Sequence, residues 1–500
     1  MSSRISALLL LILAGCTALP ATDPGAPPSP AAPKKITIVH INDVYEITPL
    51  AGGASGGLAR VAALVKALRR QNPNTIFTLG GDFFSPSALG TAMVEGQRLA
   101  GRQMVAVLNS TGLDLAVLGN HEFDLRPAEF LTRLSEASFP IIATNVTDTT
   151  GNRFPGTVPY AVRSFVWDGA DTVKIGFLGS VLPSNPQPWV RYLPWFEAMQ
   201  TATGILRDSV DILIGLTHLS INQDVELVEQ LGLDLIIGGH EHDNMMLRRG
   251  PRLTPIVKAD ANVRTVAVIE LSWDHSRRQV QIDSRLLAIG DTLPEDPDVS
   301  QTVADWVELG YAGFRANGFE PDRVIANLPM ALEGRESQTR NQPTNLAALI
   351  AEGFYREAKD ADLALVNTGS IRIDDVIPPG SITEYDLIRI LPFGGDVVVA
   401  TLSGEVLEQV LDQGEENRGT GGYLAHHGVR KDLSGRWLIN DSPISPARKY
   451  RVALTDYLAS GRERGLGFLS PTNPGVTDLL TLRDVRLALK DELLRRWPPP

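Results

Sequence analysis

The chain has 500 residues, of which 43% are hydrophobic and 21% are charged, and its formal net charge is −12. This length predicts two or more domains, and the composition is that of an ordinary soluble globular protein. The negative charge argues against a nucleic-acid polymer as the main partner, because proteins that bind its backbone normally carry a basic surface.

The N-terminal 35 residues predict export and attachment to a membrane. Residues 1–16 contain Arg4, the apolar run 7–14 and the only cysteine, Cys16, a pattern that resembles the bacterial lipoprotein signal in which the cysteine is lipidated. An ordinary signal peptide with a chance cysteine is the alternative. Residues 17–35 are rich in Pro and Ala, which predicts an extended tether. We therefore expect an extracytoplasmic protein with an N-terminal lipid anchor.

Residues 36–290 alternate short apolar runs with helical patterns, which predicts α/β architecture with buried strands. The expected strands are ITIVHI, TIFTLG, LAVLGN, PIIATN, VKIGFLG, DILIGLTH and LDLIIGG. Segments between them, such as LARVAALVKALRRQ, have helical spacing. Two longer alternating runs, TVAVIELSW and QVQIDSRLLAI, predict antiparallel strands that close a first domain near residue 290.

The rest of the chain predicts a linking helix and a second domain. Residues 291–320 include VSQTVADWVELGYAGFRA, whose periodicity is that of a connecting helix. Residues 321–500 contain the helical stretch NLAALIAEGFYREA, the strand ADLALVNTG and the strand–helix pair DVVVATLSGEVLEQVLDQ. We therefore expect a second, smaller α/β domain over 321–500.

Polar side chains follow five of the expected strands at the point where each strand ends. They are Asp43, Asp82, Asn120 with His121, His218, and His240 with His242. Any one of them could cap a turn or form a hydrogen bond in the core. Together they predict one site, because ligands of α/β sheets gather outside the carboxyl ends of the strands. Carboxylates, imidazoles and an amide carbonyl suit two divalent ions, Zn, Mn or Fe, with Asp82 as the natural bridging ligand.

This set, written D43…GGD82…GN120-H121-E122…H218…GGH240-E-H242, resembles the calcineurin-like metallophosphoesterases. With a second domain after it, the chain resembles the 5′-nucleotidase family, which includes UDP-sugar hydrolases and cyclic nucleotide phosphodiesterases. The resemblance implies a four-layer β-sandwich flanked by helices, followed by a smaller α/β (α+β) substrate-binding domain. It also implies an enzyme, a two-metal phosphohydrolase that acts on 5′-nucleotides or related phosphoesters by attack of a metal-activated hydroxide.

The resemblance implies a role for each strand-end residue. One metal ion would be bound by Asp43, Asp82 and His242, and the other by Asp82, Asn120, His218 and His240. His121 would donate to the phosphate or the leaving group, and Asp124 would orient it. A carboxylate three residues further along the chain can hold the imidazole and favour its charged form.

In the second domain, NTGSIR resembles the family's Asn-Gly-Gly-x-Ile-Arg motif. The implied substrate-binding residues are Arg340 and Arg372 for phosphate, Asn367 for the base or ribose, and Phe393 and Tyr457 for stacking on the base. The alternatives are a core position for Phe393 and a solvated surface position for Arg340. The run GRERG departs from the family's Gly-Gly-Asp-Gly and puts Glu463 nearest the ribose-binding Asp, which leaves the nucleoside preference open.

Tyr45 stands where better-known members of the family have a metal-binding His. It could ligate as a phenolate, form a hydrogen bond to a metal-bound water, or simply pack. The substrate also has alternatives within the family: nucleotide sugars, 2′,3′-cyclic nucleotides or a carrier-bound sulfur intermediate. A non-catalytic binding lipoprotein is the alternative from another class. We expect a monomer whose partner is a small phosphoester.

Overall fold

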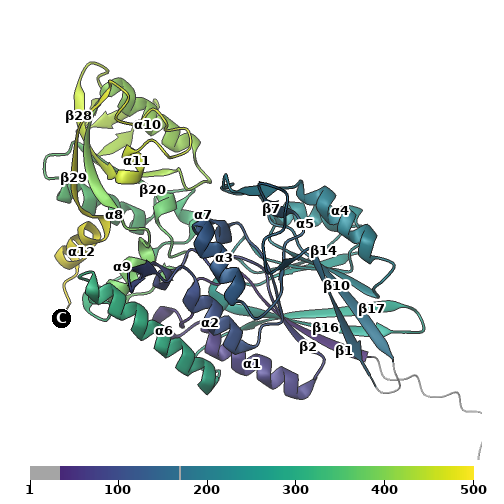
Figure 1. The fold of residues 1–500 in the computed structure, drawn as a ribbon. Coiled ribbons are helices and arrows are strands. Elements are labelled where there is room, and N and C mark those ends of the chain that lie inside the picture. Colours follow the sequence, from purple (N-terminus) through teal and green to yellow (C-terminus); the bar gives the residue numbers. More distant parts are fainter. Residues whose placement is uncertain (1–33, 168–170, 500) are drawn as a thin grey trace, which may run out of the picture.

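The computed structural model describes residues 34–167 and 171–499. The leader expected at 1–16, its Cys16 and most of the tether expected at 17–35 lie outside the described residues, so the lipid anchor stays a prediction. Within the described ranges, no helix is both long enough and apolar enough to cross a membrane. Figure 1 shows two lobes, one drawn in purple to teal and the other in green to yellow.

Two sheets pack face to face in the N-terminal lobe. Their orders are β17-β16-β1-β2-β5-β6-β8 and β14-β15-β13-β12-β10-β9. The first consists of β1 (Lys34–Ile41), β2 (Thr75–Leu79), β5 (Leu115–Val117), β6 (Ile141–Ile142), β8 (Thr157–Val158), β16 (Thr265–Asp274) and β17 (Gln279–Ala288). The second consists of β9 (Tyr160–Val166), β10 (Thr172–Leu178), β12 (Ile212–Thr217), β13 (Leu235–Gly238), β14 (Met245–Arg249) and β15 (Thr254–Lys258). Apolar side chains from both sheets, such as Ile38 and Ile214, form the core between them.

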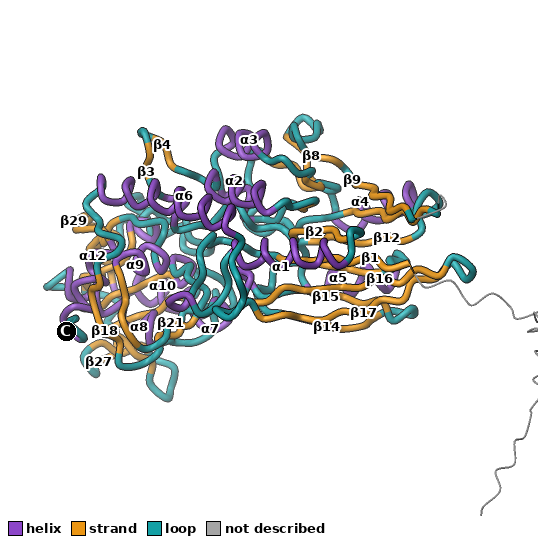
Figure 2. Tube along the Cα trace, turned by 90° about the horizontal axis from the view of Figure 1, so that it is seen from below, coloured by secondary structure: helices purple, strands orange, loops and turns teal. Residues whose placement is uncertain are grey.

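Helices cover the outer face of each sheet, which gives four layers. The first sheet is covered by α1 (Leu58–Gln71), α2 (Arg102–Thr111) and α3 (Pro127–Glu136), and the second by α4 (Trp195–Leu206) and α5 (Ile221–Gln230). The long helix α6 (Pro297–Ala316) packs on α1 and α2 and leads to the second lobe (Figures 1 and 2). The expected sandwich flanked by helices is therefore confirmed.

The local sequence explains where these elements begin and end. The last six residues of β1, ITIVHI, are all buried, and most of them are β-branched, as is typical of a strand buried on both faces. It begins at Lys34, two residues before the expected start at residue 36. Helix α6 begins after Asp296, whose carboxylate accepts a hydrogen bond from the backbone N–H of Val299 at 3.2 Å, and its first residue is Pro297.

The C-terminal lobe is built on a five-stranded sheet of order β24-β20-β28-β23-β29. Its strands are β20 (Leu363–Asn367), β23 (Asp396–Ser403), β24 (Leu424–His427), β28 (Lys449–Thr455) and β29 (Val476–Asp484). Helices α8 (Asn345–Glu357) and α12 (Val485–Arg496) pack on one face, and α10 (Gly404–Glu416) and α11 (Asp456–Ala459) on the other. This lobe is the smaller α/β domain that the sequence predicts.

Shorter elements complete the two lobes. The short strands are β3 (Met93–Val94), β4 (Gln97–Arg98), β7 (Val146–Asp148), β11 (Val190–Tyr192), β18 (Val324–Leu328), β19 (Leu332–Glu333), β21 (Val376–Ile377), β22 (Gly380–Thr383), β25 (Val429–Lys431), β26 (Trp437–Ile439) and β27 (Ser442–Pro443). Two short helices, α7 (Glu336–Thr339) and α9 (Glu384–Ile390), face the N-terminal lobe. Tyr385 and Ile388 of α9 belong to the same apolar cluster as Phe314 of α6, so the two lobes share part of a core.

Candidate active site

The polar strand ends predicted from the sequence meet at one place. Strands β1, β2 and β5 are parallel neighbours in the first sheet, and β12 and β13 are parallel neighbours in the second. Asp43 follows β1 and Asp82 follows β2, and both side chains are fully buried. Parallel strands present their carboxyl ends at one edge, so the loops that follow them lie together between the two sheets and the C-terminal lobe.

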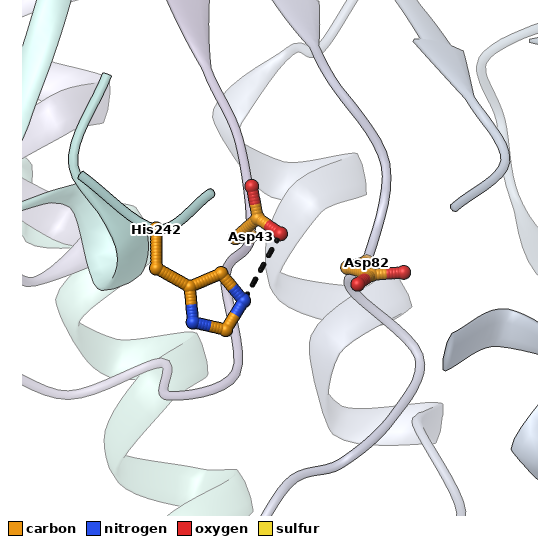
Figure 3. A group of neighbouring side chains, drawn as sticks. All are labelled: Asp43, Asp82 and His242. Atoms are coloured by element: carbon orange, nitrogen blue, oxygen red, sulfur yellow. Dashed lines mark ion pairs between the residues drawn. The ribbon is translucent and has the colours of Figure 1, made fainter. Parts of the chain in front are cut away.

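Three side chains form a close group of possible metal ligands. Ligand atoms of Asp43, Asp82 and His242 all lie within 4.8 Å of one another. Figure 3 shows the His242 ring directed at the Asp43 carboxylate, with Asp82 on the neighbouring loop. The His242 Nε2 atom lies 3.4 Å from an Asp43 oxygen. Two carboxylates and one imidazole at this spacing can share a divalent cation.

The remaining expected ligands lie around the same pair of aspartates. His218 Nε2 is 3.1 Å from an Asp82 oxygen and 3.9 Å from an Asp43 oxygen. The His240 ring packs edge-on against His218, with centroids 5.5 Å apart. In the part of the chain that the structure describes, the buried Asn120 Oδ1 and His218 Nε2 atoms have no hydrogen-bond partner. Buried polar atoms normally have partners, so the Asn120 oxygen fits a second cation, and so does His218 Nε2 once a cation displaces the proton that it shares with Asp82.

The charges in this cluster also fit a cation. Burial favours the neutral form of Asp43 and Asp82, but His218, together with His242 at Asp43 and His121 at Asp82, outweighs it and lowers the pKa of both carboxyls. Burial opposes a charge on His218 as well, but the two aspartates raise the pKa of that imidazole to about 9. Burial, followed by the charge of His218, lowers the pKa of His240 to about 3. Without a metal ion, the protonated His218 balances part of the charge of the two ionised carboxylates, and a bound cation would take over this role.

Glu122 supports the candidate site, a role that the sequence pattern does not assign to it. Its buried carboxylate accepts hydrogen bonds from the backbone N–H groups of Asp82 (3.0 Å), Phe83 (2.6 Å), Phe84 (3.0 Å) and Gly119. Burial and the charge of Asp82 raise the pKa of the Glu122 carboxyl to about 7. This one side chain therefore ties the loop after β2 to the loop after β5. Its place beside His121 in GNHEFD was the available signal.

Lys258 plays a similar role for the loops that carry His218 and His240. Its ammonium group is buried and donates to the backbone carbonyls of Leu219 (2.7 Å) and Gly239 (2.8 Å). It also forms an ion pair with Asp224 at 2.8 Å. Each carbonyl follows or precedes a candidate ligand in the chain, so Lys258 fixes the ends of β12 and β13 relative to each other.

His121 lies beside the cluster and contacts both lobes. Its Nδ1–H donates to the Asp124 carboxylate at 2.6 Å, which is the orientation that the sequence predicts. Its Nε2 accepts a hydrogen bond from the guanidinium of Arg372 at 3.1 Å, across 251 positions of the chain. An expected phosphate-binding residue of the second domain thus lies directly against the expected catalytic histidine.

A cleft of about 1170 Å³ runs between the two lobes and contains the expected site. Asp82, Asn120, His121, Asp124, His240 and His242 line its N-terminal side, and Arg340, Asn367, Arg372, Phe393, Tyr457 and Glu463 line its C-terminal side. Asp43 and His218 lie behind this lining and are fully buried. The structure therefore brings the predicted site residues of both domains to one cleft and its immediate floor.

The two arginines of this cleft are held by one carboxylate. Glu336 pairs with Arg372 at 2.7 Å and with Arg340 at 2.6 Å. The Nε atoms of Arg340 and Arg372 are buried, and neither has a hydrogen-bond partner among the described residues. Each guanidinium therefore keeps a donor for an anionic ligand. The sequence reasoning did not assign Glu336, which precedes Arg340 by one helical turn.

Aromatic and polar groups of the second lobe also line the cleft. Phe393 is 61% exposed and Tyr457 is 37% exposed, so neither is a core residue. The alternative of a core position for Phe393 is therefore wrong. The guanidinium of Arg462 lies 5.2 Å from the centre of the Tyr457 ring. The Glu463 carboxylate accepts a hydrogen bond from the side-chain amide of Asn367 at 3.4 Å. Exposed rings beside such groups can bind a flat, polar ligand.

Tyr45 points its hydroxyl group at the metal-ligand candidates. The oxygen lies 2.9 Å from His242 Nε2, 3.3 Å from an Asp82 oxygen and 3.5 Å from an Asp43 oxygen. Burial, followed by the charges of Asp82 and Asp43, raises the pKa of the phenol well above its usual value. The neutral hydroxyl is therefore the form that this pocket favours.

Comparison with known proteins agrees with this architecture. Residues 36–244 match the family model of the calcineurin-like phosphoesterases, and residues 324–468 match that of the 5′-nucleotidase C-terminal domain. The Vibrio parahaemolyticus 5′-nucleotidase is 26% identical, with 96% of this chain and 93% of that protein covered. The Bacillus subtilis trifunctional nucleotide phosphoesterase protein YfkN is 27% identical over 77% of this chain, which spans only 28% of that longer protein.

Among solved structures, the 5′-nucleotidase precursor from Thermus thermophilus superimposes with a TM-score of 0.75 at 24% identity. The match covers 92% of this chain and 96% of that one, so the two share a fold. The fold, the two domain matches and the named relatives define a phosphoester hydrolase. The chain belongs to the 5′-nucleotidase family, in which a calcineurin-like phosphoesterase domain precedes a 5′-nucleotidase C-terminal domain. A calcineurin-like phosphoesterase domain implies divalent metal ions, for which the Asp43 cluster is suited.

Proposed function

We propose that this protein is a two-metal phosphohydrolase that releases phosphate from 5′-nucleotides or related phosphoesters. The observation that carries the proposal is the cluster of Asp43, Asp82 and His242, which lies under a cleft lined by the arginines of the second domain. A cluster of carboxylates and imidazoles can bind cations, and a pair of guanidinium groups can bind a phosphate. The two requirements of metal-assisted phosphoester hydrolysis thus occur together.

The proposed ligands of one ion are Asp43, Asp82 and His242, and those of the other are Asp82, Asn120, His218 and His240. When bound, divalent ions such as Zn, Mn or Fe would supply positive charge that activates water and stabilises the phosphoryl oxygens. Tyr45 is proposed as a neutral hydrogen-bond donor beside this site, because its hydroxyl is close to three ligand candidates and its phenolate is disfavoured.

His121 is proposed to donate a proton or hydrogen bond to the leaving oxygen. The carboxylate of Asp124 accepts from Nδ1 and leaves Nε2 directed to the cleft, where it now contacts Arg372. A protonated Nε2 in this position would stabilise negative charge that develops in the transition state. Arg340 and Arg372, each with a free Nε donor within the described part of the chain, would hold the phosphate.

The nucleoside is proposed to bind near Phe393 and Tyr457, where exposed rings line the cleft. Asn367 and Glu463 would contact the ribose or the base, because the two groups form a hydrogen-bonded pair at the same end of the cleft. The cleft volume of about 1170 Å³ exceeds the usual 300–1,000 Å³ range of small-molecule sites. Nucleotide sugars therefore stay in the set of substrates to be tested, together with 2′,3′-cyclic nucleotides.

The test is phosphate release by the purified full chain supplied with Mn²⁺ or Zn²⁺. AMP, UDP-glucose and 2′,3′-cyclic AMP are compared, with His121→Ala as the variant. We expect turnover of at least one substrate, and a loss of kcat in His121→Ala of about 10²- to 10⁴-fold with unchanged metal content. Absence of turnover on all three in the presence of bound metal would contradict the proposal. Loss of metal in His121→Ala would contradict the role given to that residue.

A further inference from the structure

A short segment of the second domain reaches the metal-ligand candidates. The Asp374 carboxylate accepts a hydrogen bond from Nδ1 of His242, and the two form an ion pair across 132 positions of the chain. The next residue, Asp375, pairs with Arg264 of the first domain at 3.4 Å. Asp374 thus contacts a candidate ligand directly, whereas Asp375 makes a domain contact without touching one.

The contact with Asp374 decides which nitrogen of His242 is available. A carboxylate only accepts, so Nδ1 must carry the proton. Nε2 is then the nitrogen that can ligate, and it is directed at an Asp43 oxygen 3.4 Å away and at the Tyr45 hydroxyl 2.9 Å away. Figure 3 shows this orientation of the ring toward Asp43. Asp374 therefore fixes both the tautomer and the direction of the His242 side chain.

Asp374 is itself held firmly. Its side chain is 8% exposed, and its other oxygen accepts a hydrogen bond from the backbone N–H of Glu336 at 2.7 Å. Its backbone has a φ of 39°, a left-handed conformation that only a minority of non-glycine residues adopt. The second domain thus supplies a buried carboxylate whose position is set by its own backbone and by the start of α7.

We propose that Asp374 is a positioning residue for the metal site, so that metal binding in the first domain depends on a side chain of the second. Carboxylate partners of ligating histidines fix the ring and raise its basicity, and their loss typically lowers metal affinity about 10- to 100-fold. The inference rests on the proposed function in one respect, because it takes His242 as a metal ligand. The inference adds that residues of both domains contribute to the metal site.

The test measures metal binding itself. The full chain is stripped with a chelator and titrated with Mn²⁺ by calorimetry or by competition with a chromogenic chelator. Asp374→Ala removes the acceptor, and Asp374→Asn keeps a weaker one of the same size. Asp375→Ala is the matched control, because it removes the adjacent carboxylate, which pairs with Arg264 and makes no contact with the His242 ring. A second background, His242→Ala, shows whether Asp374 acts through that ring.

We expect the affinity of one Mn²⁺ site to fall about 10- to 100-fold in Asp374→Ala and by less in Asp374→Asn, and to stay near the wild-type value in Asp375→Ala. In the His242→Ala background, Asp374→Ala should cause no further loss. Wild-type affinity in both Asp374 variants, or an equal loss in Asp375→Ala, would overturn the inference and leave the proposed function intact. Failure of the wild-type chain to bind either Mn²⁺ or Zn²⁺ in the same titration would instead contradict the proposed function.

Discussion

Four expected metal ligands hold backbone conformations that are unusual for residues other than glycine. The φ angles are 52° at Asp43, 56° at Asp82, 92° at His240 and 62° at His242. Each such conformation costs on the order of 1–3 kcal/mol and persists only where the surroundings over-determine it. The bonds from Glu122 and Lys258 to the neighbouring loops provide that support. Strain of this kind concentrates where function requires an aimed side chain.

Tyr45→Phe tests the hydroxyl that lies among the ligand candidates. We expect both metal ions to be retained, because the phenol is not proposed as a ligand. Loss of one hydrogen bond of about 1 kcal/mol should lower kcat roughly fivefold. The measurement is metal analysis together with steady-state kinetics on the best substrate. Loss of one ion would show that Tyr45 ligates, and an unchanged rate with unchanged metal would show that it only packs.

The ligand candidates could be predicted from sequence because each directly follows an apolar strand. Asp43 and Asp82 stand at the ends of ITIVHI and TIFTLG, and the strands β1 and β2 formed where expected. Their supporting groups gave weaker signals: Glu122 is marked only by its place beside His121, and Lys258 by nothing local. Glu122 and Lys258 act through backbone atoms of distant loops, and such contacts depend on how loops fold back, which no local periodicity records.

The loop after β5 approaches the loop after β2 so closely that only glycine fits at position 119. A Cβ atom there would meet the Asp82 side chain and would lie 2.6 Å from the Asp82 backbone nitrogen. We therefore expect Gly119→Ala to displace Asp82 and to lower both metal content and phosphatase activity, with the overall fold retained. Circular dichroism and metal analysis of the purified variant measure the two effects separately.

Gly204 provides the matched control for this substitution. It lies in α4, and an added Cβ atom would meet nothing within 4 Å. Gly204→Ala should leave metal content and activity unchanged and raise stability by about 0.5–1 kcal/mol, because alanine favours the helix. Wild-type metal content in Gly119→Ala would show that the loops can separate and that their close contact is dispensable.

His40 links the two sheets of the first domain and gives stability a specific dependence on pH. Its Nε2–H donates to the carbonyl of Gly238 in β13 at 3.1 Å, and its Nδ1 accepts from Thr78 in β2 at 3.0 Å. Burial lowers the pKa of His40 from 6.5 to about 4. Between these values the unfolded chain binds a proton that the folded chain does not, so the free energy of unfolding falls as the pH falls.

Between pH 7 and pH 5, the free energy of unfolding should fall by about 2 kcal/mol more in the wild type than in His40→Gln, because glutamine does not titrate. Denaturant unfolding in the presence of a chelator measures it without interference from metal binding. The exposed His275 supplies a control, and His275→Gln should follow the wild type. Parallel pH dependences of wild type and His40→Gln would show that His40 is not the group responsible.

The placement of the two domains is the part of the structure that sequence patterns left unpredicted. Strands and helices in each domain followed from local periodicity, as in LARVAALVKALRRQ, which forms α1. The contacts of Arg372 with His121 and of Asp374 with His242 join residues far apart in the chain. These contacts depend on how whole domains pack. The sequence around a charged loop residue does not indicate which distant residue it will contact.

Glu46 lies at the centre of this packing and allows its contribution to be measured. It is buried, accepts a hydrogen bond from Tyr385 of α9 at 3.0 Å and lies 3.9 Å from the Arg389 guanidinium. Glu46→Ala leaves both partners buried without this acceptor, so we expect a loss of about 2–3 kcal/mol in the free energy of unfolding.

Glu46→Gln keeps an acceptor for Tyr385 and should cost less than Glu46→Ala. Asp441→Ala breaks the exposed pair with Arg430, whose side chains are 83% and 58% accessible, and should change stability by at most about 1 kcal/mol. Denaturant unfolding of the three variants at neutral pH gives the comparison. An equal effect of Glu46→Ala and Asp441→Ala would contradict this role of Glu46. The apolar contacts between α6 and α9, which are also buried where the two lobes meet, would then hold the domains together. A loss shared by spectroscopic probes in both domains would instead show that Glu46 couples their unfolding.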